Sequence, residues 1–337
     1  MTVLLIATGG TIASKPQPGK GVTVALDGRD LLETVAAGPQ GFDTSDIEVL
    51  DVTHGASWNF EPAFMGEVAV LARDALAGGQ ADSVVITHGT DTLEETAFLV
   101  WLLAGPTAAE TGPVVVTGAM RHAGQPDGDG PRNLRDAFTV ARSPAAQAAG
   151  VVVCMHRELH DPRWVTKTHA HELDSFRSPG SGAVGTVRDG TVTLTAPIAP
   201  RPDVVLPHTP PIDPAVAVIR SESGIDDELV PWLLGRGVHG LVIEGTGAGN
   251  VNAALVPGIE AALGSSVPVV ITTRCVGGAV APVYGGPGGG HTITGLGVIP
   301  GGALTAAKAR LALGVALAVD TEPDAVAQWM TALASVT

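Results

Sequence analysis

Three segments of the chain combine residue types that could carry out a nucleophilic reaction. The first, Thr8–Ser14, follows the apolar run Val3–Ala7 and contains Gly9 and Gly10. Two glycines let the backbone turn tightly and approach a ligand, which would present the hydroxyl of Thr11 at the rim of a sheet. Because a Gly-Gly pair after a strand is also ordinary turn composition, this segment alone leaves a purely structural role open.

The second segment, His88–Thr96, follows the apolar run Val84–Thr87. Polar side chains such as Thr90 and Asp91 at a strand end, on the N-terminus of a helix, could form an oxyanion-binding site. Glutamates also stand three positions after Asp91 and after Thr92, which is the spacing of a capping box. Helix capping and catalysis therefore explain this segment equally well.

The third segment, Val165–His169, places Lys167 between two threonines in a chain that has only four lysines. A lysine removed from water can have a lowered pKa and act as the base for a hydroxyl, whereas a salt bridge is the structural alternative. His169 and His171 would share one face of a strand, but no third ligand or carboxylate accompanies them at metal-binding spacing. We therefore expect no metal site.

The elements that must position these residues alternate between strands and helices. The apolar runs are continuous, as expected for strands covered on both faces, and the alternation predicts a parallel doubly wound sheet. A hairpin is predicted around Asp189-Gly190, from Gly185–Val187 to Thr191–Leu194. The predicted strands are Val3–Ala7, Ile47–Val52, Val84–Thr87, Val114–Thr117, Gly150–Met155, Val216–Ile219, Leu241–Ile243 and Val267–Thr272. The predicted helices include Pro62–Ala77, Asp91–Ala104 with a single apolar stripe, and Pro131–Arg142.

A proline-rich stretch divides the chain into two predicted domains. Seven prolines fall between Pro197 and Pro214, where neither a helix nor a central strand can form. We predict a larger N-terminal α/β domain over 1–200, with a mostly parallel doubly wound sheet and the β-hairpin. A linker over 201–212 would join it to a smaller C-terminal α/β domain with a parallel sheet over 213–337.

Composition and charge narrow the possible partners. The formal net charge of −15 disfavours binding to nucleic acid or to an anionic membrane. No basic region precedes the first apolar run, and no run approaches the ~18 residues of a membrane span, so we expect a soluble cytoplasmic protein. Cys154 and Cys275 have no metal-like spacing and are predicted to be buried thiols.

One loop of the second domain could also contact a ligand. Gly245–Asn250 follows the predicted strand Leu241–Ile243, so it lies at a carboxyl end, where parallel sheets bind ligands. Its glycines allow close approach, and the amide of Asn250 offers both a donor and an acceptor. The alternative is a tight turn in which Asn250 caps the next helix.

Taken together, the motifs resemble those of the bacterial L-asparaginase/glutaminase family. The similarity extends in order along essentially the whole chain. It is carried by Thr8–Ala13 (TGGTIA), His88–Thr96 (HGTDTLEET), Val165–Thr168 (VTKT), Gly118–Arg121, Asp129–Pro131, Ser175-Phe176, Gly247–Asn250 and Lys308–Arg310.

The resemblance implies a two-domain α/β amidohydrolase without metal or organic cofactor, which converts L-asparagine to L-aspartate and ammonia. By position, Thr11 matches the family's nucleophile, and Thr90, Asp91 and Lys167 match its second catalytic group. It further implies that Asp91 holds the substrate ammonium. It also implies that Ser57, which matches a serine of the family, binds the α-carboxylate of the substrate.

The resemblance also implies a homodimer or homotetramer, in which Asn250 reaches a neighbour's substrate. The chain departs from the family pattern at three places. The lid, Ser14–Val24, has no tyrosine, because Tyr284 is the only tyrosine of the chain. Trp58 stands where a substrate-binding glutamine is common, and no acidic residue matches the one that a neighbouring subunit often supplies.

Three alternatives remain open at this point. The first is a glutaminase, or an enzyme of mixed or D-amino-acid preference, since one methylene is worth only ~1–3 kcal/mol of discrimination. The second is the tRNA-dependent amidotransferase component that resembles asparaginases. The third is an amino-acid-binding protein that has lost catalysis.

Overall fold

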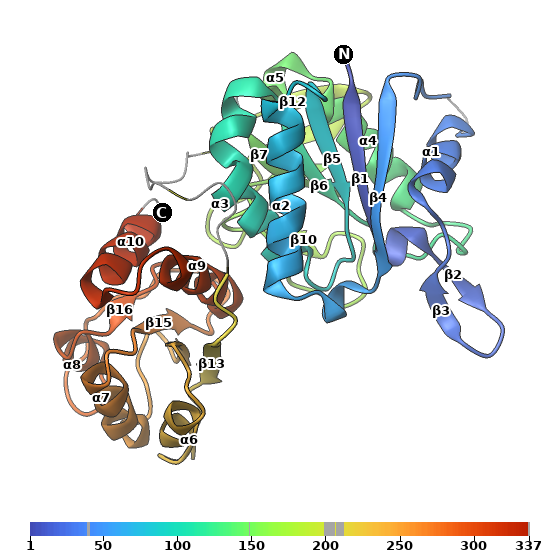
Figure 1. Ribbon diagram of the computed structural model, residues 1–337. Helices are drawn as coiled ribbons and strands as arrows, with labels where there is room; N and C mark the ends of the chain where they lie inside the picture. The colour runs from blue at the N-terminus through green and yellow to red at the C-terminus, as the bar shows by residue number, and fades with distance from the viewer. Residues whose placement is uncertain (39–40, 148, 199–205, 207–211, 336–337) are drawn as a thin grey trace. The chain divides into compact units, whose positions relative to one another are not determined.

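The chain folds into two compact units, Met1–Pro200 and Arg201–Thr337 (Figure 1). The linker predicted over 201–212 lies outside the described residues, except for residues 206 and 212. Each unit is built around its own sheet. The computed structural model describes residues 1–38, 41–147, 149–198, 206 and 212–335.

The first unit contains an eight-stranded sheet, and the predicted strands of this unit all form. From one edge to the other its strands are β12 (Thr191–Leu194), β11 (Gly185–Arg188), β8 (Glu158–His160), β7 (Val151–Met155), β6 (Val114–Thr117), β5 (Ser83–Thr87), β1 (Val3–Gly9) and β4 (Ile47–Gly55). Strands β7, β6, β5, β1 and β4 are parallel, whereas β8, β11 and β12 pair antiparallel. The prediction of a mostly parallel, doubly wound sheet with a hairpin is confirmed.

The hairpin β11–β12 turns where the sequence predicts. Its two turn residues, Asp189 and Gly190, have φ angles of 50° and 76°. These left-handed values are those of the tight turns that match the twist of two antiparallel strands.

Helices cover both faces of this sheet, which explains the continuous apolar strands. The helices α1 (Gly28–Ala36) and α4 (Gly130–Ala141) pack on one face. The helices α2 (Pro62–Ala77) and α3 (Leu93–Thr111) pack on the other, where Figure 1 shows α2 in front of the sheet. Every residue of β5, β6 and β7 is buried as a result. A short helix, α5 (Pro144–Gln147), precedes β7.

The prediction for α3 is wrong in two respects. The helix continues to Thr111 instead of ending at Ala104, although Pro106 removes one helical hydrogen bond. It also has no single apolar stripe, since Phe98, Leu99 and their neighbours are buried on every side. Contacts with α2 on one side and with β6 and β7 on the other account for both differences.

The strand order creates a crevice at the carboxyl ends of β1 and β5. The chain leaves β1 toward α1 on one face and leaves β5 toward α3 on the other face. Residues at these two strand ends lie side by side, with Ala7 opposite Thr87. A position at which the chain departs to opposite faces is where sheets of this type bind ligands.

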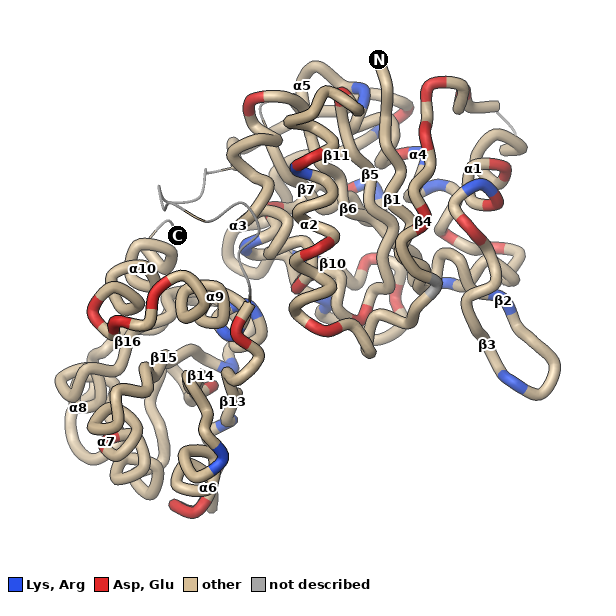
Figure 2. The backbone as a smooth tube through the Cα atoms, viewed as in Figure 1, with Lys and Arg blue, Asp and Glu red and all other residues tan. Residues whose placement is uncertain are grey.

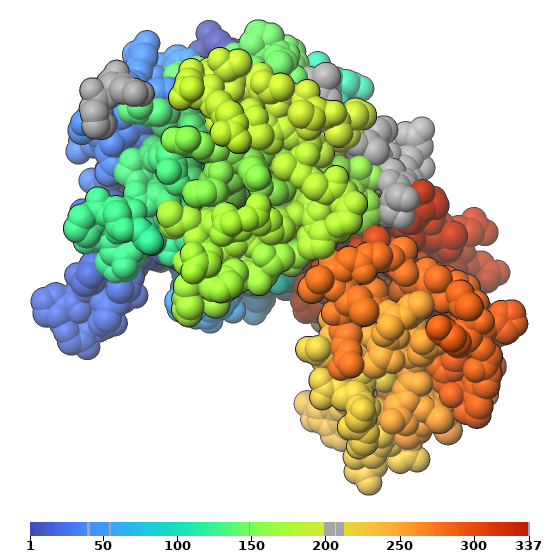
Figure 3. Space-filling view, turned by 180° about the vertical axis from the view of Figure 1, so that it is seen from behind, coloured from blue at the N-terminus to red at the C-terminus, as the bar shows by residue number. Residues whose placement is uncertain are grey.

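A second hairpin stands beside this crevice. Strands β2 (Ser14–Gln17) and β3 (Gly21–Val24) form the lid predicted over Ser14–Val24, and the hairpin projects from the first unit (Figure 3). Acidic residues outnumber basic ones by 34 to 19 in the chain, yet the charged residues of the hairpin are Lys15 and Lys20 (Figure 2). The lid therefore brings positive charge to an acidic protein.

The second unit has a smaller, all-parallel sheet, as predicted. Its strands lie in sequence order: β13 (Val216–Arg220), β14 (Gly240–Gly245), β15 (Val269–Thr273) and β16 (Ile299–Pro300). Its helices are α6 (Leu229–Gly235), α7 (Val256–Gly264), α8 (Gly290–Gly295), α9 (Ala306–Val319) and α10 (Pro323–Ser335).

Two further predictions concern burial. Cys154 is buried in β7 as expected, but the prediction for Cys275 is wrong, because this thiol is exposed just beyond the end of β15. No helix in the described part of the chain combines the length and hydropathy needed to span a lipid bilayer.

Candidate active site

Close backbone contact brings the loop after β1 against the loop after β5. Gly9 and Gly10 have φ angles of 91° and 81°, in the left-handed region that favours glycine. A Cβ on Gly10 would lie 2.4 Å from both the Cα and the nitrogen of Gly89. Only a residue without a side chain allows this approach, which brings Thr11 and Thr90 to the same crevice.

A third loop packs against Gly89. Ser57 begins the short helical turn Ser57–Asn59 after β4, and a Cβ on Gly89 would lie 2.5 Å from its Oγ. Ser57 is buried, and its carbonyl accepts a hydrogen bond of 2.9 Å from the hydroxyl of Thr92. Three loops that are distant in the sequence therefore meet at the carboxyl edge of the sheet.

His88 holds the peptide that precedes Thr90. Its ring is fully buried, and this burial lowers the pKa of His88 to about 4, although the bond to Gly89 acts in the opposite direction. Its Nδ1 lies 2.8 Å from the carbonyl oxygen of Gly89, so Nδ1 must donate. Its Nε2 then accepts from the hydroxyl of Thr96, 2.8 Å away. His88 is thus a neutral residue that fixes the backbone beside the candidate site.

Lys167 makes both of the contacts considered for it from the sequence. It lies in β9 (Thr166–Lys167), which pairs with β10 (Phe176–Arg177). Its Nζ is 2.9 Å from the hydroxyl of Thr90 and 2.7 Å from Oδ1 of Asp91. The lysine side chain is 17 % exposed and that of Asp91 is 50 % exposed, so the pair lies at the border of the protein interior.

The proposed capping box is not formed by Glu94. The N-cap residue of α3 is Thr92, which makes no side-chain capping bond. The carboxylate of Glu94 instead accepts from the hydroxyl of Thr166 at 2.9 Å and from the backbone N–H of Lys167 at 2.5 Å. A carboxylate in the first turn of α3 therefore secures β9.

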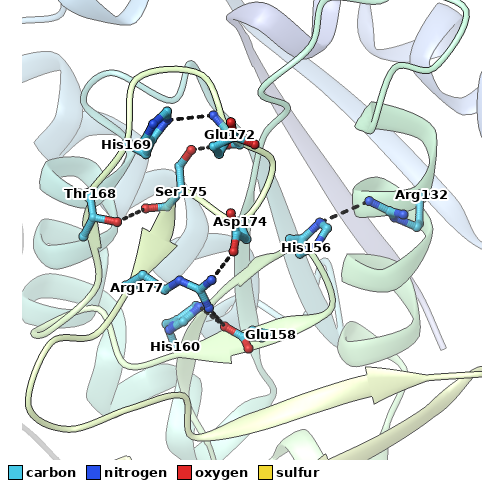
Figure 4. A network of polar contacts seen from close by, with 10 residues as sticks. All are labelled: Arg132, His156, Glu158, His160, Thr168, His169, Glu172, Asp174, Ser175 and Arg177. Atoms are coloured by element: carbon cyan, nitrogen blue, oxygen red, sulfur yellow. Dashed lines mark hydrogen bonds and ion pairs between the residues drawn. The ribbon is translucent and has the colours of Figure 1, made fainter.

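The turn after Lys167 is ordered by its own polar contacts (Figure 4). The backbone N–H and hydroxyl of Thr168 both donate to the carbonyl of Ser175. Nδ1 of His169 accepts from the backbone N–H groups of His171 and Glu172. The two histidines lie in this turn and not on a strand, which corrects the prediction. Among the described residues, no three His, Cys, Asp or Glu side chains are grouped to hold a metal ion.

A cavity of about 430 Å³ is lined by three of the predicted catalytic residues, Thr11, Thr90 and Asp91, while Lys167 lies behind Thr90 and Asp91 and does not line it. This volume is within the usual range for small-molecule sites. Within the described residues, the hydroxyl of Thr11 has no hydrogen-bond partner, and Trp58 is 68 % exposed at the border of the cavity. The lining residues are Gly10, Thr11, Ser14, Val22, Thr23, Val24, Ala56, Ser57, Trp58, Gly89, Thr90 and Asp91.

The predicted residue of the second unit has a structural contact of its own. Oδ1 of Asn250 accepts a hydrogen bond of 2.9 Å from the backbone N–H of Gly290, the first residue of α8. The helix that follows directly is instead capped by Asn252, whose side chain accepts from Ala254. Asn250 therefore satisfies a helix N-terminus, though not the one expected. Tyr284, also in this unit, is exposed.

Comparison with known proteins agrees with this arrangement. Residues 2–199 match the family described as "Asparaginase, N-terminal", and residues 215–330 match the "Glutaminase/Asparaginase C-terminal domain". The chain belongs to the asparaginase family. This confirms the resemblance found in the motifs, and the asparaginase family is one of hydrolases that act on amide C–N bonds.

Individual members of the asparaginase family cover nearly the whole chain. The "Probable L-asparaginase" of Deinococcus radiodurans is 40 % identical over an alignment of 316 residues, which covers 93 % of this chain and 92 % of that protein. The solved structure of the "Probable Cytoplasmic L-asparaginase from Campylobacter jejuni" has a TM-score of 0.81 at 30 % identity and covers 98 % of each chain. A component of the "Glutamyl-tRNA(Gln) amidotransferase" of Halobacterium salinarum is 32 % identical over an alignment of 348 positions, gaps included, which covers 97 % of this chain and 78 % of that protein.

Sequence reasoning missed the residues that support the site. The sequence leaves helix capping and catalysis equally open for the segment that contains Glu94 and Thr92, and it assigns no role to His88. A usable signal existed, because polar residues followed one another through a segment whose surroundings are apolar. Their partners, such as Thr166 for Glu94, lie too far along the chain for spacing to reveal them.

Proposed function

We propose that this chain hydrolyses the side-chain amide of L-asparagine to L-aspartate and ammonia, with Thr11 as the nucleophile. The observation that supports this most strongly is the hydrogen bonding of Lys167 to both Thr90 and Asp91, which line the same cavity as Thr11. Amide hydrolysis needs an activated hydroxyl, a path for protons and donors for the developing oxyanion.

The reaction would proceed in two steps. The oxygen of Thr11 attacks the amide carbon, its proton passes to the leaving nitrogen, and ammonia departs to leave an ester on Thr11. Water then adds to the ester carbon, aspartate leaves, and the hydroxyl of Thr11 is restored. The hydroxyl of Thr90, held by Lys167, orients and transfers protons in both steps.

Charge in the cavity favours a free amino acid over a simple amide. Oδ1 of Asp91 is engaged by Lys167, and Oδ2 makes no hydrogen bond with the described residues, so it is available for a substrate ammonium. Ser57 is the candidate for binding the α-carboxylate, and Trp58 borders the same cavity. A carboxylate and an ammonium in contact make a charge-assisted bond, which is stronger than a neutral one.

We further propose that the enzyme acts in the cytoplasm as a homodimer or homotetramer, in which Asn250 of one subunit completes the site of another. Its Nδ2 makes no hydrogen bond with the described residues and can donate to a ligand, although Oδ1 is engaged by Gly290.

Ammonia release by the purified protein tests the function. Wild type and Thr11→Ala are each assayed on L-asparagine, L-glutamine and their D-forms. Thr191→Ala is the matched control, since Thr191 is an exposed threonine in the hairpin β11–β12. Thr11→Ala should lose several orders of magnitude in kcat, as removal of one member of a cooperating set usually does. Retention of more than about a tenth of kcat would exclude Thr11 as the nucleophile.

The alternative functions give different results in the same assay. A glutaminase releases ammonia faster from L-glutamine, and an amino-acid-binding protein binds asparagine without releasing ammonia. An amidotransferase component releases little ammonia until its partner and charged tRNA are added. Each outcome would replace the proposed substrate or activity.

A further inference from the structure

The first turn of α3 is tied to two segments that are remote in the sequence and that both reach the candidate site. Glu94 accepts from Thr166 and from the backbone of Lys167, 72 and 73 residues away. Thr92 donates to the carbonyl of Ser57, 35 residues away in the other direction. Neither Glu94 nor Thr92 lines the cavity.

We propose that this turn is the positioning element of the active site, in which Glu94 fixes Lys167 and Thr92 fixes Ser57. The proposal rests on the function proposed above, because it assigns Lys167 to the chemical step and Ser57 to substrate binding. Glu94 and Thr92 are positioning residues, since both act through residues that line or reach the cavity.

The segment containing Lys167 needs such support. Strands β9 and β10 have two residues each, and a two-stranded ribbon is at best marginally stable by itself. A lysine side chain is a flexible four-carbon stem, so the position of its ammonium group depends on where its backbone is held. Glu94 holds that backbone directly, through the N–H of Lys167.

The second tie acts on a different function. Ser57 packs against Gly89, and the hydroxyl of Thr92 holds the carbonyl of the same serine. Loss of this bond would move the candidate carboxylate-binding residue and leave Thr90, Asp91 and Lys167 in place. The two residues should therefore affect different kinetic constants.

Steady-state kinetics on L-asparagine test this division. Glu94→Ala should lower kcat by roughly 30- to 100-fold with KM changed less than about threefold, because a displacement of ~1 Å is costly in the chemical step. Thr92→Val, which keeps the shape of the side chain, should raise KM by about tenfold with kcat nearly unchanged. Glu110→Ala is the matched control, since Glu110 is an exposed glutamate at the other end of α3.

A conservative variant separates positioning from charge. In Glu94→Gln the amide oxygen can accept from the N–H of Lys167 while the amide nitrogen donates to the hydroxyl of Thr166, so kcat should stay within about threefold of wild type. Thr166→Val should lower kcat less than Glu94→Ala does. It should cause no further loss in the Glu94→Ala background, because the two residues share one bond.

Several results would overturn the proposal. Equal losses of kcat in Glu94→Gln and Glu94→Ala would make the charge, and not the position, the important property. A lower Tm with unchanged kcat in Glu94→Ala would leave only a structural role. If Glu94→Ala does not fold, unchanged kcat in Thr166→Val decides against the proposal, and reduced kcat supports it.

The function itself fails by a different result. Ammonia release that persists in Thr11→Ala and in Lys167→Met would contradict the proposed mechanism. If Thr11→Ala and Lys167→Met are inactive but Glu94→Ala is fully active, the proposed function stands and only the positioning role of Glu94 is refuted.

Discussion

The buried ring of His88 predicts a loss of stability in mild acid. In the folded protein burial lowers the pKa of His88 to about 4, from an ordinary value of 6.5. Between these two values the unfolded chain binds more protons than the folded one, so stability decreases as the pH falls. The stability that depends on a neutral His88 is fully present above pH 6.5, and it is lost progressively as the pH falls to about 4.

The size of this effect follows from the two pKa values. At about pH 5 an exposed histidine is mostly protonated and His88 is mostly neutral, so the free energy of unfolding is lower than at neutral pH by about 2 kcal/mol. This is a large part of the ~5–15 kcal/mol that stabilises a typical domain. The charged ring is disfavoured because burial removes it from water, and the contacts that the described residues make with it, from Gly89, Thr96 and the ring of Phe60, include no carboxylate.

Urea unfolding at near-neutral pH and near pH 5 measures the effect. His88→Asn keeps a donor for the carbonyl of Gly89 and removes the titrating group. Its free energy of unfolding should be lower than that of wild type at neutral pH, but it should fall by about 2 kcal/mol less on acidification. His291→Gln, at an exposed histidine, should behave like wild type. The same acid-induced change in His88→Asn and wild type would refute the reasoning.

Three more predictions concern activity. Asp91→Asn should raise KM for L-asparagine by at least about tenfold, and it should raise KM less for an analogue that lacks the α-amine. An equal rise in KM for both substrates would exclude ammonium binding by Asp91. Gly10→Ala should lower kcat by about 100-fold or prevent folding, because its methyl would overlap Gly89; ammonia release and Tm at wild-type values would contradict the close contact. Thr11→Ala and Asn250→Ala subunits, refolded together, should recover activity that neither has alone, whereas an active monomer by light scattering would exclude a shared site.

Much of the fold could be predicted because its signals are local. A strand covered on both faces must be apolar at every position, so Val84–Thr87 and Val114–Thr117 could be located almost to the residue. Likewise the helix Pro62–Ala77 has its proline and its glycines at its two ends. The end of α3 could not be found in this way, since packing against α2 and the sheet continues the helix through Pro106.

The sequence by itself determined which residues are candidates for chemistry. Thr11 and Thr90 each follow a predicted strand, and in a parallel sheet the carboxyl ends of strands lie along one edge. Lys167 stood out because lysine is rare in the chain. The motifs around these residues were sufficient to indicate the asparaginase family, which the comparisons confirmed.

Only the tertiary structure decided how these residues are held. The contact of Gly10 with Gly89 depends on β1 and β5 being neighbours, and strand order is not encoded in the local pattern of either strand. The bond between Glu94 and Thr166 depends on the path of the chain between them. The spacing of Glu94 from Asp91 is compatible both with a capping box and with a bond to a remote segment. Which donor Glu94 binds depends on which donor lies within reach in the folded chain, and the sequence does not contain that distance.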